Sequence, residues 1–410
     1  MNCLSHDGYI LFAARVIRMF AYGFLSVVLV LYLAKLGLSG VLIGLILSLA
    51  LIGDAAISLW MTTNADRLGR RKVLIIGAGL ILFAAALFAL TDNVALLLLA
   101  AIIGVISPSG YEVGPFLPVE QAALSQIVLD ERRTHVFAWY NLAGSFATAT
   151  GALAGGIFSQ ILQRIGIAPV NSYRAVVIVY GAIGLLLALL FSRLSSSVEA
   201  VHSDAAPAQH RLGLHRSRSV ILKLSALFGL DAFAGGFVVQ SLVAYWFHVR
   251  FGVDPAALGG IFFGANILAG ISALAAAWVA ARIGLVNTMV FTHLPSNFLL
   301  MLIPLMPNLP LATFVLFARF SISQMDVPPR QSYTMAIVAP DERSAAAGVT
   351  GIARSIGAAV SPALAGAFLS SSAFFAAPFF VAGGLKVVYD LLLYRAFASS
   401  HRTQTVQSAR

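Results

Sequence analysis

The chain has 410 residues, of which 60% are hydrophobic and only 10% are charged. Soluble domains carry about 25% charged residues, so this chain has too little polar surface to cover itself in water and belongs in a lipid bilayer. The net charge of +10 does not indicate a nucleic-acid partner, because the basic residues gather at the ends of apolar segments and not in one patch.

Twelve segments reach the length of about 20 mainly apolar residues that a membrane-spanning helix needs. They begin near Tyr9, Ser39, Val73, Val94, Val136, Ala175, Val220, Ala256, Leu285, Leu311, Ala345 and Phe374. Their connections are short except for residues 195–217, which are polar, small and basic and are expected to form a flexible linker. The sequence therefore predicts an all-α membrane protein with a six-helix half at 1–194, a second at 218–398 and a tail at 399–410.

Basic side chains are distributed unevenly between the two ends of these segments. If the N-terminus lies inside, the outer ends carry few basic residues, namely Lys35, Arg164, Arg174 and Arg250. The inner ends and loops carry many more, and cytoplasmic loops are enriched in Lys and Arg. We therefore expect a multi-pass protein of a bacterial-type inner membrane with both termini and the linker in the cytoplasm.

The gap between the second and third segments reads Asp66-Arg67-Leu68-Gly69-Arg70-Arg71-Lys72. Such a run of charges cannot lie in hydrocarbon and marks a membrane exit. It resembles the signature loop of the major facilitator superfamily, Gly-x-x-x-Asp-Arg-x-Gly-Arg-Arg/Lys, and the matching residues are Asp66, Arg67, Gly69, Arg70 and Arg71. We expect this loop to act as a conformational latch, in which Asp66 accepts from the positive end of a neighbouring helix with Arg70 held alongside.

The two halves also resemble each other in sequence. Residues that match between the halves in the fourth and tenth segments and just after them are Pro118 with Pro328, Gln121 with Gln331, and Arg133 with Arg343. The first and seventh segments align Arg18, Gly23, Phe24 and Tyr32 with Asp231, Gly236, Phe237 and Tyr245. Two six-helix halves related in parallel are the architecture of the resembled family, and this repeat predicts twelve helices in two pseudo-symmetric halves.

Charged residues inside the apolar segments are candidates for function, because a charge at mid-bilayer costs at least about 2.5–3.5 kcal/mol. The candidates for a substrate and proton cavity are Arg15, Arg18, Glu112, Glu120, Asp231, Asp326 and Arg330. The resemblance implies that helices 1, 4, 7 and 10 line this cavity. Glu120 and Arg330 occupy equivalent positions with opposite charges, so they are expected either to bind substrate and protons or to bridge the halves and hold one side shut.

Glu112 lies in a stretch, residues 107–118, that is interrupted by prolines and glycines. Such residues break a helix and leave carbonyl groups free, and irregular backbone at membrane depth is tolerated only inside protein or beside water. We expect Glu112 to carry the coupling proton, because burial disfavours the charged carboxylate. The alternative is a neutral Glu112 that is hydrogen-bonded to the free backbone groups.

The other intramembrane charges have simpler interpretations. Asp326 with Arg330, and Lys386 with Asp390, are four residues apart on their helices and are expected to pair with each other. Asp54 is expected to cap or pair nearby. Arg319 and Arg354 have no local partner in sequence and serve either anion contact or packing. His248 and His293 are predicted to be isolated near helix ends.

The fifth segment contains Gly151-Ala152-Leu153-Ala154-Gly155-Gly156. It resembles the Gly-Pro-x-x-Gly-Gly motif of major facilitator antiporters, with Ala152 in place of Pro. The glycines Gly151, Gly155 and Gly156 equally fit a small-residue face for close helix packing.

Together these features favour a secondary transporter that moves a small polar solute by alternating access, with proton-coupled efflux as the preferred direction. Arginine binds carboxylate and phosphate, so an anionic or zwitterionic solute is expected. The alternatives are a proton-coupled importer and a non-transporting membrane receptor or assembly factor. No enzyme motif, phosphate-binding loop, cofactor motif or metal cluster is present in the sequence, and a monomer is expected.

Overall fold

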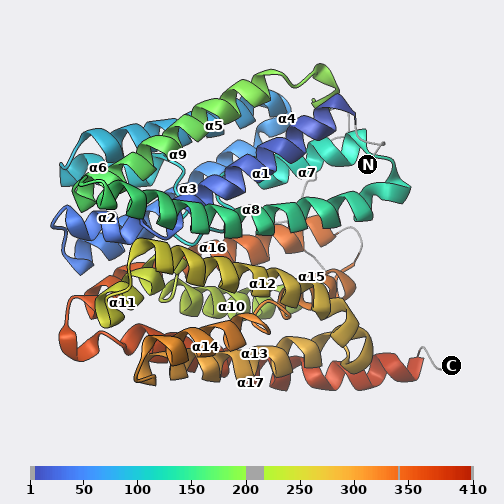
Figure 1. The fold of residues 1–410 in the computed structure, drawn as a ribbon. Helices are drawn as coiled ribbons and strands as arrows, with labels where there is room; N and C mark the ends of the chain where they lie inside the picture. Colours follow the sequence, from blue (N-terminus) through green and yellow to red (C-terminus); the bar gives the residue numbers. More distant parts are fainter. Residues whose placement is uncertain (1–4, 200–216, 340–341, 408–410) are drawn as a thin grey trace. The chain divides into compact units, whose positions relative to one another are not determined.

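The computed structural model describes residues 5–199, 217–339 and 342–407. Most of the expected linker, 195–217, and the last residues of the expected tail, 399–410, lie outside the described residues. Every regular element in the described part of the chain is a helix, which agrees with the predicted all-α fold (Figure 1).

The first half of the chain begins with a polar cap: the hydroxyl of Ser5 accepts from the amide of Gly8 at 3.2 Å and opens the first helix. The helices of this half are α1 (His6–Ser26), α2 (Leu29–Lys35), α3 (Gly40–Thr63), α4 (Ala65–Leu68), α5 (Arg70–Leu90), α6 (Val94–Ile103), α7 (Phe116–Ile127), α8 (Asp130–Arg164), α9 (Pro169–Ser192) and the short η1 (Ser196–Val198).

The second half follows the same order of long and short helices. Its elements are α10 (Arg218–Gly236), α11 (Gln240–Phe251), α12 (Pro255–Ile283), α13 (Leu285–Leu302), η2 (Ile303–Leu305), α14 (Leu309–Phe320), α15 (Val327–Ala336), α16 (Arg343–Leu369), η4 (Ser372–Phe374) and α17 (Ala377–Gln407). Gly284 before α13 has φ +84°, as Gly69 before α5 has φ +96°, so both halves use a glycine-only conformation at the equivalent turn.

Within the described residues, ten helices are long and apolar enough to cross a membrane. The other two expected spans are broken: α6 and α14 are apolar but short, and each continues as α7 or α15 after an irregular stretch. The breaks fall at equivalent places, residues 104–115 and 321–326. The first contains Gly110 and Gly114, both at positive φ. Proline and glycine thus break the fourth span, whereas the break in the tenth span precedes Pro328 and Pro329 in the first turn of α15.

The chain packs as two compact units. Unit 1 comprises Met1–Asp204 with Val239–Asn266, and unit 2 comprises Ala205–Val238 with Ile267–Arg410. Helix α11 and the start of α12 therefore pack with the first half: the Ser241 amide donates to the carbonyl of Pro108 at 3.1 Å. Unit 2 has a buried apolar core that includes Leu224, Phe228 and Met289.

Candidate functional site

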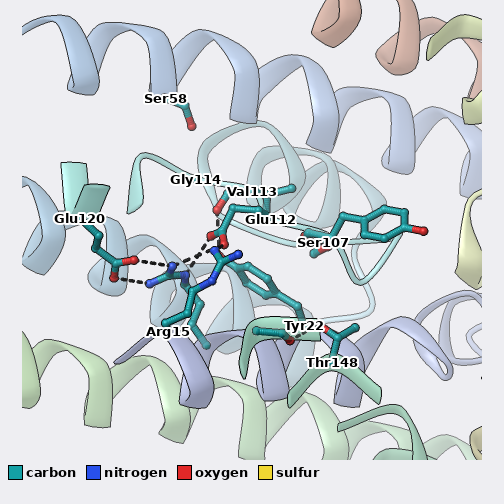
Figure 2. A network of polar contacts seen from close by, with 12 residues as sticks. Arg15, Tyr22, Ser58, Ser107, Glu112, Val113, Gly114, Glu120 and Thr148 are labelled. Atoms are coloured by element: carbon teal, nitrogen blue, oxygen red, sulfur yellow. Dashed lines mark hydrogen bonds and ion pairs between the residues drawn. The ribbon is translucent and has the colours of Figure 1, made fainter. Parts of the chain in front are cut away.

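A buried ionic cluster lies in unit 1 between the middle of α1 and the broken fourth span. Arg18 on α1 and Glu120 on α7 are both completely buried, and their charged groups meet through two hydrogen bonds of 2.5 and 2.7 Å. The Nε of Arg18 also donates to Glu112 at 2.9 Å. Two nearly parallel bonds between a guanidinium and a carboxylate form the strongest common ion-pair geometry, and they attach α7 to α1 (Figure 2).

Arg15 stands one turn before Arg18 and contacts the other oxygen of Glu112. Its guanidinium lies against α8 at Gly144 and 5.0 Å from the ring centre of Tyr140. The Nε of Arg15 is buried and has no hydrogen-bond partner among the residues that the structure describes. Arg15 thus keeps donor capacity beyond its contact with Glu112, whereas the donors of Arg18 are engaged.

Glu112 differs from Glu120 in its surroundings. Its side chain is 15% exposed, and it projects from the irregular stretch rather than from a helix. The neighbouring backbone is held in place: the hydroxyl of Tyr22 donates to the carbonyl of Val113 at 2.9 Å, and the amide of Gly114 donates to Asp54 at 2.6 Å. These bonds satisfy backbone groups that the break leaves free. They also confirm the expectation that Asp54 pairs nearby.

A second buried cluster lies in unit 2 around Asp231 on α10. One carboxylate oxygen accepts from the ammonium of Lys386 on α17 at 2.5 Å, and the other accepts from Arg330 on α15 at 3.1 Å. Arg330 also contacts Asp326 at 3.0 Å, as their spacing predicted. Arg354 on α16 approaches Asp231 to 3.9 Å. Asp231 therefore contacts cationic side chains from three other helices.

The two clusters are the same arrangement with the charges exchanged. In unit 1, Arg18 of the first span pairs with Glu120 of the fourth. In unit 2, Asp231 of the seventh span pairs with Arg330 of the tenth. The bridge between halves that the sequence suggested for Glu120 and Arg330 is thus not required to neutralise them, because each has its partner within its own unit.

Two expectations are wrong, one for the last span and one for His293 on α13. Lys386 does not pair with Asp390 four residues away but bonds Asp231. Asp390 instead accepts from His293 at 2.9 Å and from Asn297 at 2.9 Å, both on α13. His293 is therefore not isolated, because it lies between two carboxylates. The spacing rule failed here because a buried carboxylate on another helix offered Lys386 a closer partner.

The signature loop forms the short helix α4, the turn at Gly69 and the start of α5. Asp66 bonds the side chain of Arg70 at 2.8 Å, and Arg67 is exposed. Arg70 reaches Gln126 on α7 at 2.9 Å, and Arg71 donates to the carbonyl of Ser192 at 2.6 Å. The loop thus ties α5 to the ends of α7 and α9 within unit 1.

The sequence assigned Glu199 to the flexible linker, yet the structure places it at the N-terminus of α5. Its carboxylate accepts from the amides of Arg70 at 2.6 Å and Arg71 at 3.3 Å. It is Glu199, and not Asp66, that takes the helix-terminal amides in this loop. The start of the linker is held further by Asp7, which accepts from the amide of Ser195 at 3.0 Å.

The glycines of α8 lie where other backbones approach most closely. A Cβ at Gly151 would stand 2.0 Å from the carbonyl oxygen of Phe20, and one at Gly155 would stand 2.1 Å from that of Phe24. At Gly156 the same atom would meet the carbonyl of Pro255 at 2.2 Å. Any side chain at these positions would separate α8 from α1 or from the start of α12.

The structure thus gathers Arg15, Arg18, Glu112 and Glu120 in unit 1, and Asp231, Asp326 and Arg330 in unit 2. Sequence reasoning did not assign Tyr140, whose hydroxyl donates to Glu120, or Lys386, His293 and Glu199 to these groups. For Lys386 and His293 the available signal was a charged residue or a histidine inside an apolar segment. Glu199 offered no such signal. No group of His, Cys, Asp and Glu side chains suited to a metal ion occurs among the described residues.

Comparison with known proteins identifies the family. The family model described as Major Facilitator Superfamily matches residues 11–362. The chain belongs to the major facilitator superfamily. It is 30% identical over 422 residues to the uncharacterised membrane protein YJR124C of Saccharomyces cerevisiae, covering 96% of this chain and 94% of the yeast protein. A shorter likeness of 29% identity links 35% of this chain to 36% of the quinolone resistance protein NorA of Staphylococcus aureus.

Solved structures show the same fold at low sequence identity. A bacterial homologue of the human lysosomal transporter Spinster superposes with a TM-score of 0.71 at 16% identity, covering 96% of this chain and 95% of that one. The nucleoside transporter NupG superposes with a TM-score of 0.69 at 15% identity, covering 96% and 99%. Family and fold confirm a multi-pass membrane transporter of the predicted architecture.

Proposed function

We propose that this superfamily member is a proton-coupled secondary transporter that moves a small anionic or zwitterionic organic solute in the same direction as a proton. The observation that carries the proposal is that one partly exposed carboxylate, Glu112, occupies the guanidinium groups of both Arg15 and Arg18. A carboxylate or phosphate group of a solute has the same chemistry as Glu112 and would compete with it for Arg15.

Protonation of Glu112 removes its negative charge and releases Arg15. Arg18 remains neutralised by Glu120, so the charge made available is that of Arg15, which already has an unsatisfied Nε. An anionic group of the solute can then take the place of Glu112. Proton binding and solute binding thus favour each other, and this coupling must be reciprocal. Two ligands that favour each other travel together through alternating access.

The irregular stretch that carries Glu112 suits this exchange. A side chain on a loop between two helix fragments can withdraw from Arg15 without moving a whole helix. Tyr22 and Asp54 hold the backbone at Val113 and Gly114, directly after Glu112, and the hydroxyl of Ser107 donates to the carbonyl of Tyr111, directly before it, at 2.6 Å. The movement is therefore confined to the neighbourhood of Glu112. We place the signature loop and both chain ends in the cytoplasm of the cell, on the distribution of Lys and Arg.

The second candidate is proton-coupled efflux, in which proton and solute compete. Two observations favour it: the partial likeness to NorA, whose name refers to quinolone resistance, and the glycine face of α8. In that mechanism a cationic solute would bind deprotonated Glu112 and would leave when Glu112 is protonated. The two candidates therefore predict opposite signs of proton movement when the solute binds.

The test has two steps on the purified protein. Dicarboxylates, amino acids, sugar phosphates and organic cations are first screened for a rise in melting temperature, which reports binding. Proton uptake or release is then measured in weakly buffered solution as the stabilising compound is added. Uptake with an anionic or zwitterionic compound supports the proposal, and release with a cation supports efflux instead.

The variant Glu112→Gln gives the second readout, in proteoliposomes. We expect it to lose accumulation driven by a pH gradient while keeping exchange of solute for solute, because exchange needs alternating access but no net proton movement. The matched control is Asp92→Asn, which removes an exposed carboxylate paired with Arg174 at 2.7 Å and lying outside the cluster. Gradient-driven accumulation that is unchanged in Glu112→Gln would exclude Glu112 as the proton carrier.

A further inference from the structure

His293 on α13 forms a buried contact with carboxylates on two other helices. Its Nδ1 lies 2.9 Å from Asp390 on α17, and its Nε2 lies 3.8 Å from Asp231 on α10. His293 is 5% exposed, and Asp390 is completely buried. Histidine is the side chain whose charge ordinarily changes between about pH 5 and 8, so an imidazole placed between two carboxylates is a candidate proton-binding group.

The contacts define which ring nitrogen would receive the proton. Asn297 donates to one oxygen of Asp390 at 2.9 Å, so Asp390 acts as a hydrogen-bond acceptor. The other oxygen of Asp390 lies 2.9 Å from Nδ1 of His293, and the amide nitrogen of Asn297 lies 3.2 Å from the same Nδ1. An ionised carboxylate can only accept a hydrogen bond, so we assign the proton of the neutral ring to Nδ1. The lone pair of Nε2 is left facing the carboxylate of Asp231. A proton added at Nε2 would convert this repulsive approach into an attractive one.

Other charged or titratable groups of unit 2 contact the carboxylates beside His293 or lie on helices close to it. They are Asp231 on α10, Asp326 and Arg330 on α15, Arg354 on α16, Lys386, Tyr389 and Asp390 on α17, and Arg319 on the neighbouring α14, whose guanidinium lies over the ring of Phe320. The oxygen of Asp231 that faces His293 is the same Oδ1 that accepts from Lys386 at 2.5 Å. Protonated His293 and Lys386 would therefore be two cations that donate to the same oxygen, and their mutual repulsion would weaken the bond of Lys386.

We propose that His293 is a second proton-binding residue of this transporter. When its imidazole is protonated, it replaces Lys386 as the main hydrogen-bond donor to Oδ1 of Asp231. Uptake of the proton links α13 to α10 and loosens the link between α10 and α17. The ammonium of Lys386 then needs another anion. The proposal goes beyond the function proposed above, because it concerns unit 2 and does not require Glu112 to titrate.

The first test observes the ring directly and needs no transport. Protein labelled with ¹³C and ¹⁵N in histidine is titrated in lipid nanodiscs, and the signals of His293 are identified by their loss in His293→Gln. We expect this ring to change from the singly protonated Nδ1–H form to the doubly protonated form as the pH is lowered, because Nε2 faces the carboxylate of Asp231. A ring that keeps one protonation state throughout the titration overturns the proposal.

Neighbouring variants test the assigned geometry without removing the histidine. In Asp390→Asn the neutral ring should lose its preference for the Nδ1–H tautomer, because the acceptor that selects it is gone. In Lys386→Met the protonated ring should hold Asp231 without a competitor, and the midpoint of the titration should change. A ring whose tautomer and midpoint are unaffected in both variants overturns the proposed contacts.

Transport provides the functional readout and keeps the two proposals separate. Net uptake in His293→Gln should keep only the pH dependence that Glu112 gives and lose the part that the imidazole adds. His248→Gln should behave as the unmodified protein, because the ring of His248 faces the carbonyl of Val253 at 2.7 Å. Titration of His293 without proton-driven transport would refute the proposed function and leave this site standing. Proton-driven transport with an inert His293 would do the reverse.

Discussion

Neutralising Arg18 should destabilise the protein more than neutralising its partner Glu120. Both side chains are completely buried, and they share two hydrogen bonds. In Glu120→Gln the guanidinium of Arg18 keeps a carboxylate, because Glu112 remains at 2.9 Å. In Arg18→Gln the carboxylate of Glu120 keeps, among the described residues, the hydroxyl of Tyr140 as its hydrogen-bond donor. The two single changes therefore leave unequal charges without a partner.

The magnitudes follow from these remaining contacts. Leaving a buried charge without its partner costs about 3–5 kcal/mol, which we expect for Arg18→Gln. Loss of hydrogen bonds to a charged group costs about 1.5–3 kcal/mol, which we expect for Glu120→Gln. The double variant Arg18→Gln with Glu120→Gln removes both charges of the pair. It should be at least about 2 kcal/mol more stable than the sum of the two single losses predicts.

The assay is thermal unfolding of the purified protein in detergent, compared at one pH and one detergent concentration. At about 2–4 °C per kcal/mol for a unit of this size, a loss of about 3 kcal/mol lowers the melting temperature by roughly 6–12 °C. The control cycle combines Glu120→Gln with Arg330→Gln. These two changes should add within about 0.5 kcal/mol, because each residue has its partners in its own unit. The reasoning is refuted if the double variant of the control cycle regains stability while the double variant of Arg18 and Glu120 does not. That result would support an ion pair between Glu120 and Arg330 across the two halves.

Two further predictions concern packing and the signature loop. Gly155→Ala should destabilise by about 1–3 kcal/mol, because its Cβ would meet the carbonyl oxygen of Phe24, whereas Gly79→Ala has open space around its Cβ and should change the melting temperature little. Equal melting temperatures for the two variants would contradict the close approach at Gly155. Glu199→Gln should lower stability by about 1 kcal/mol through loss of the charged cap on α5. Asp66→Asn changes a side chain that is 65% exposed and should slow transport with little effect on stability. Normal turnover in Asp66→Asn would refute the latch proposed for this loop.

The sequence was sufficient for the fold because membrane helices are set by local composition. Every backbone polar group in hydrocarbon must be satisfied within a helix, so length and apolarity alone mark the spans. The break in the fourth span was also visible, since prolines and glycines crowd residues 107–118. The extent of that break was not predictable, because it depends on tertiary bonds such as that from the Gly114 amide to Asp54.

The partners of buried charges could not be predicted in the same way. Spacing along a helix gives only local candidates, and it succeeded for Asp326 with Arg330 but failed for Lys386 with Asp390. The actual partner of Asp390, His293, is 97 residues away in sequence. Glu199 was missed for a related reason, because a polar residue in a linker shows no signal until its position beside the first amides of α5 is known.

Equivalent positions of the two halves carry opposite charges, and the sequence alone is compatible with two ways of pairing them. Opposite signs at equivalent positions permit a pair between the halves, and they equally permit a pair within each half. The contacts of Arg18 with Glu120 and of Asp231 with Arg330 favour the second arrangement. If each unit moves as one body during the proposed alternating access, a pair within one unit persists through the cycle and does not by itself serve as a gate.

If these pairs persist, the groups that change partners during transport must be those with weaker or shared contacts. In unit 1 that description fits Arg15, whose Nε has no acceptor, and Glu112, which is partly exposed. In unit 2 it fits His293 and Lys386, which approach the same oxygen of Asp231. Each unit would then combine one fixed ion pair, which holds its broken helix in place, with one exchangeable contact where a proton or an anion can enter. Substitutions in the fixed pairs should mainly change stability, whereas substitutions at the exchangeable contacts should mainly change the dependence of transport on pH.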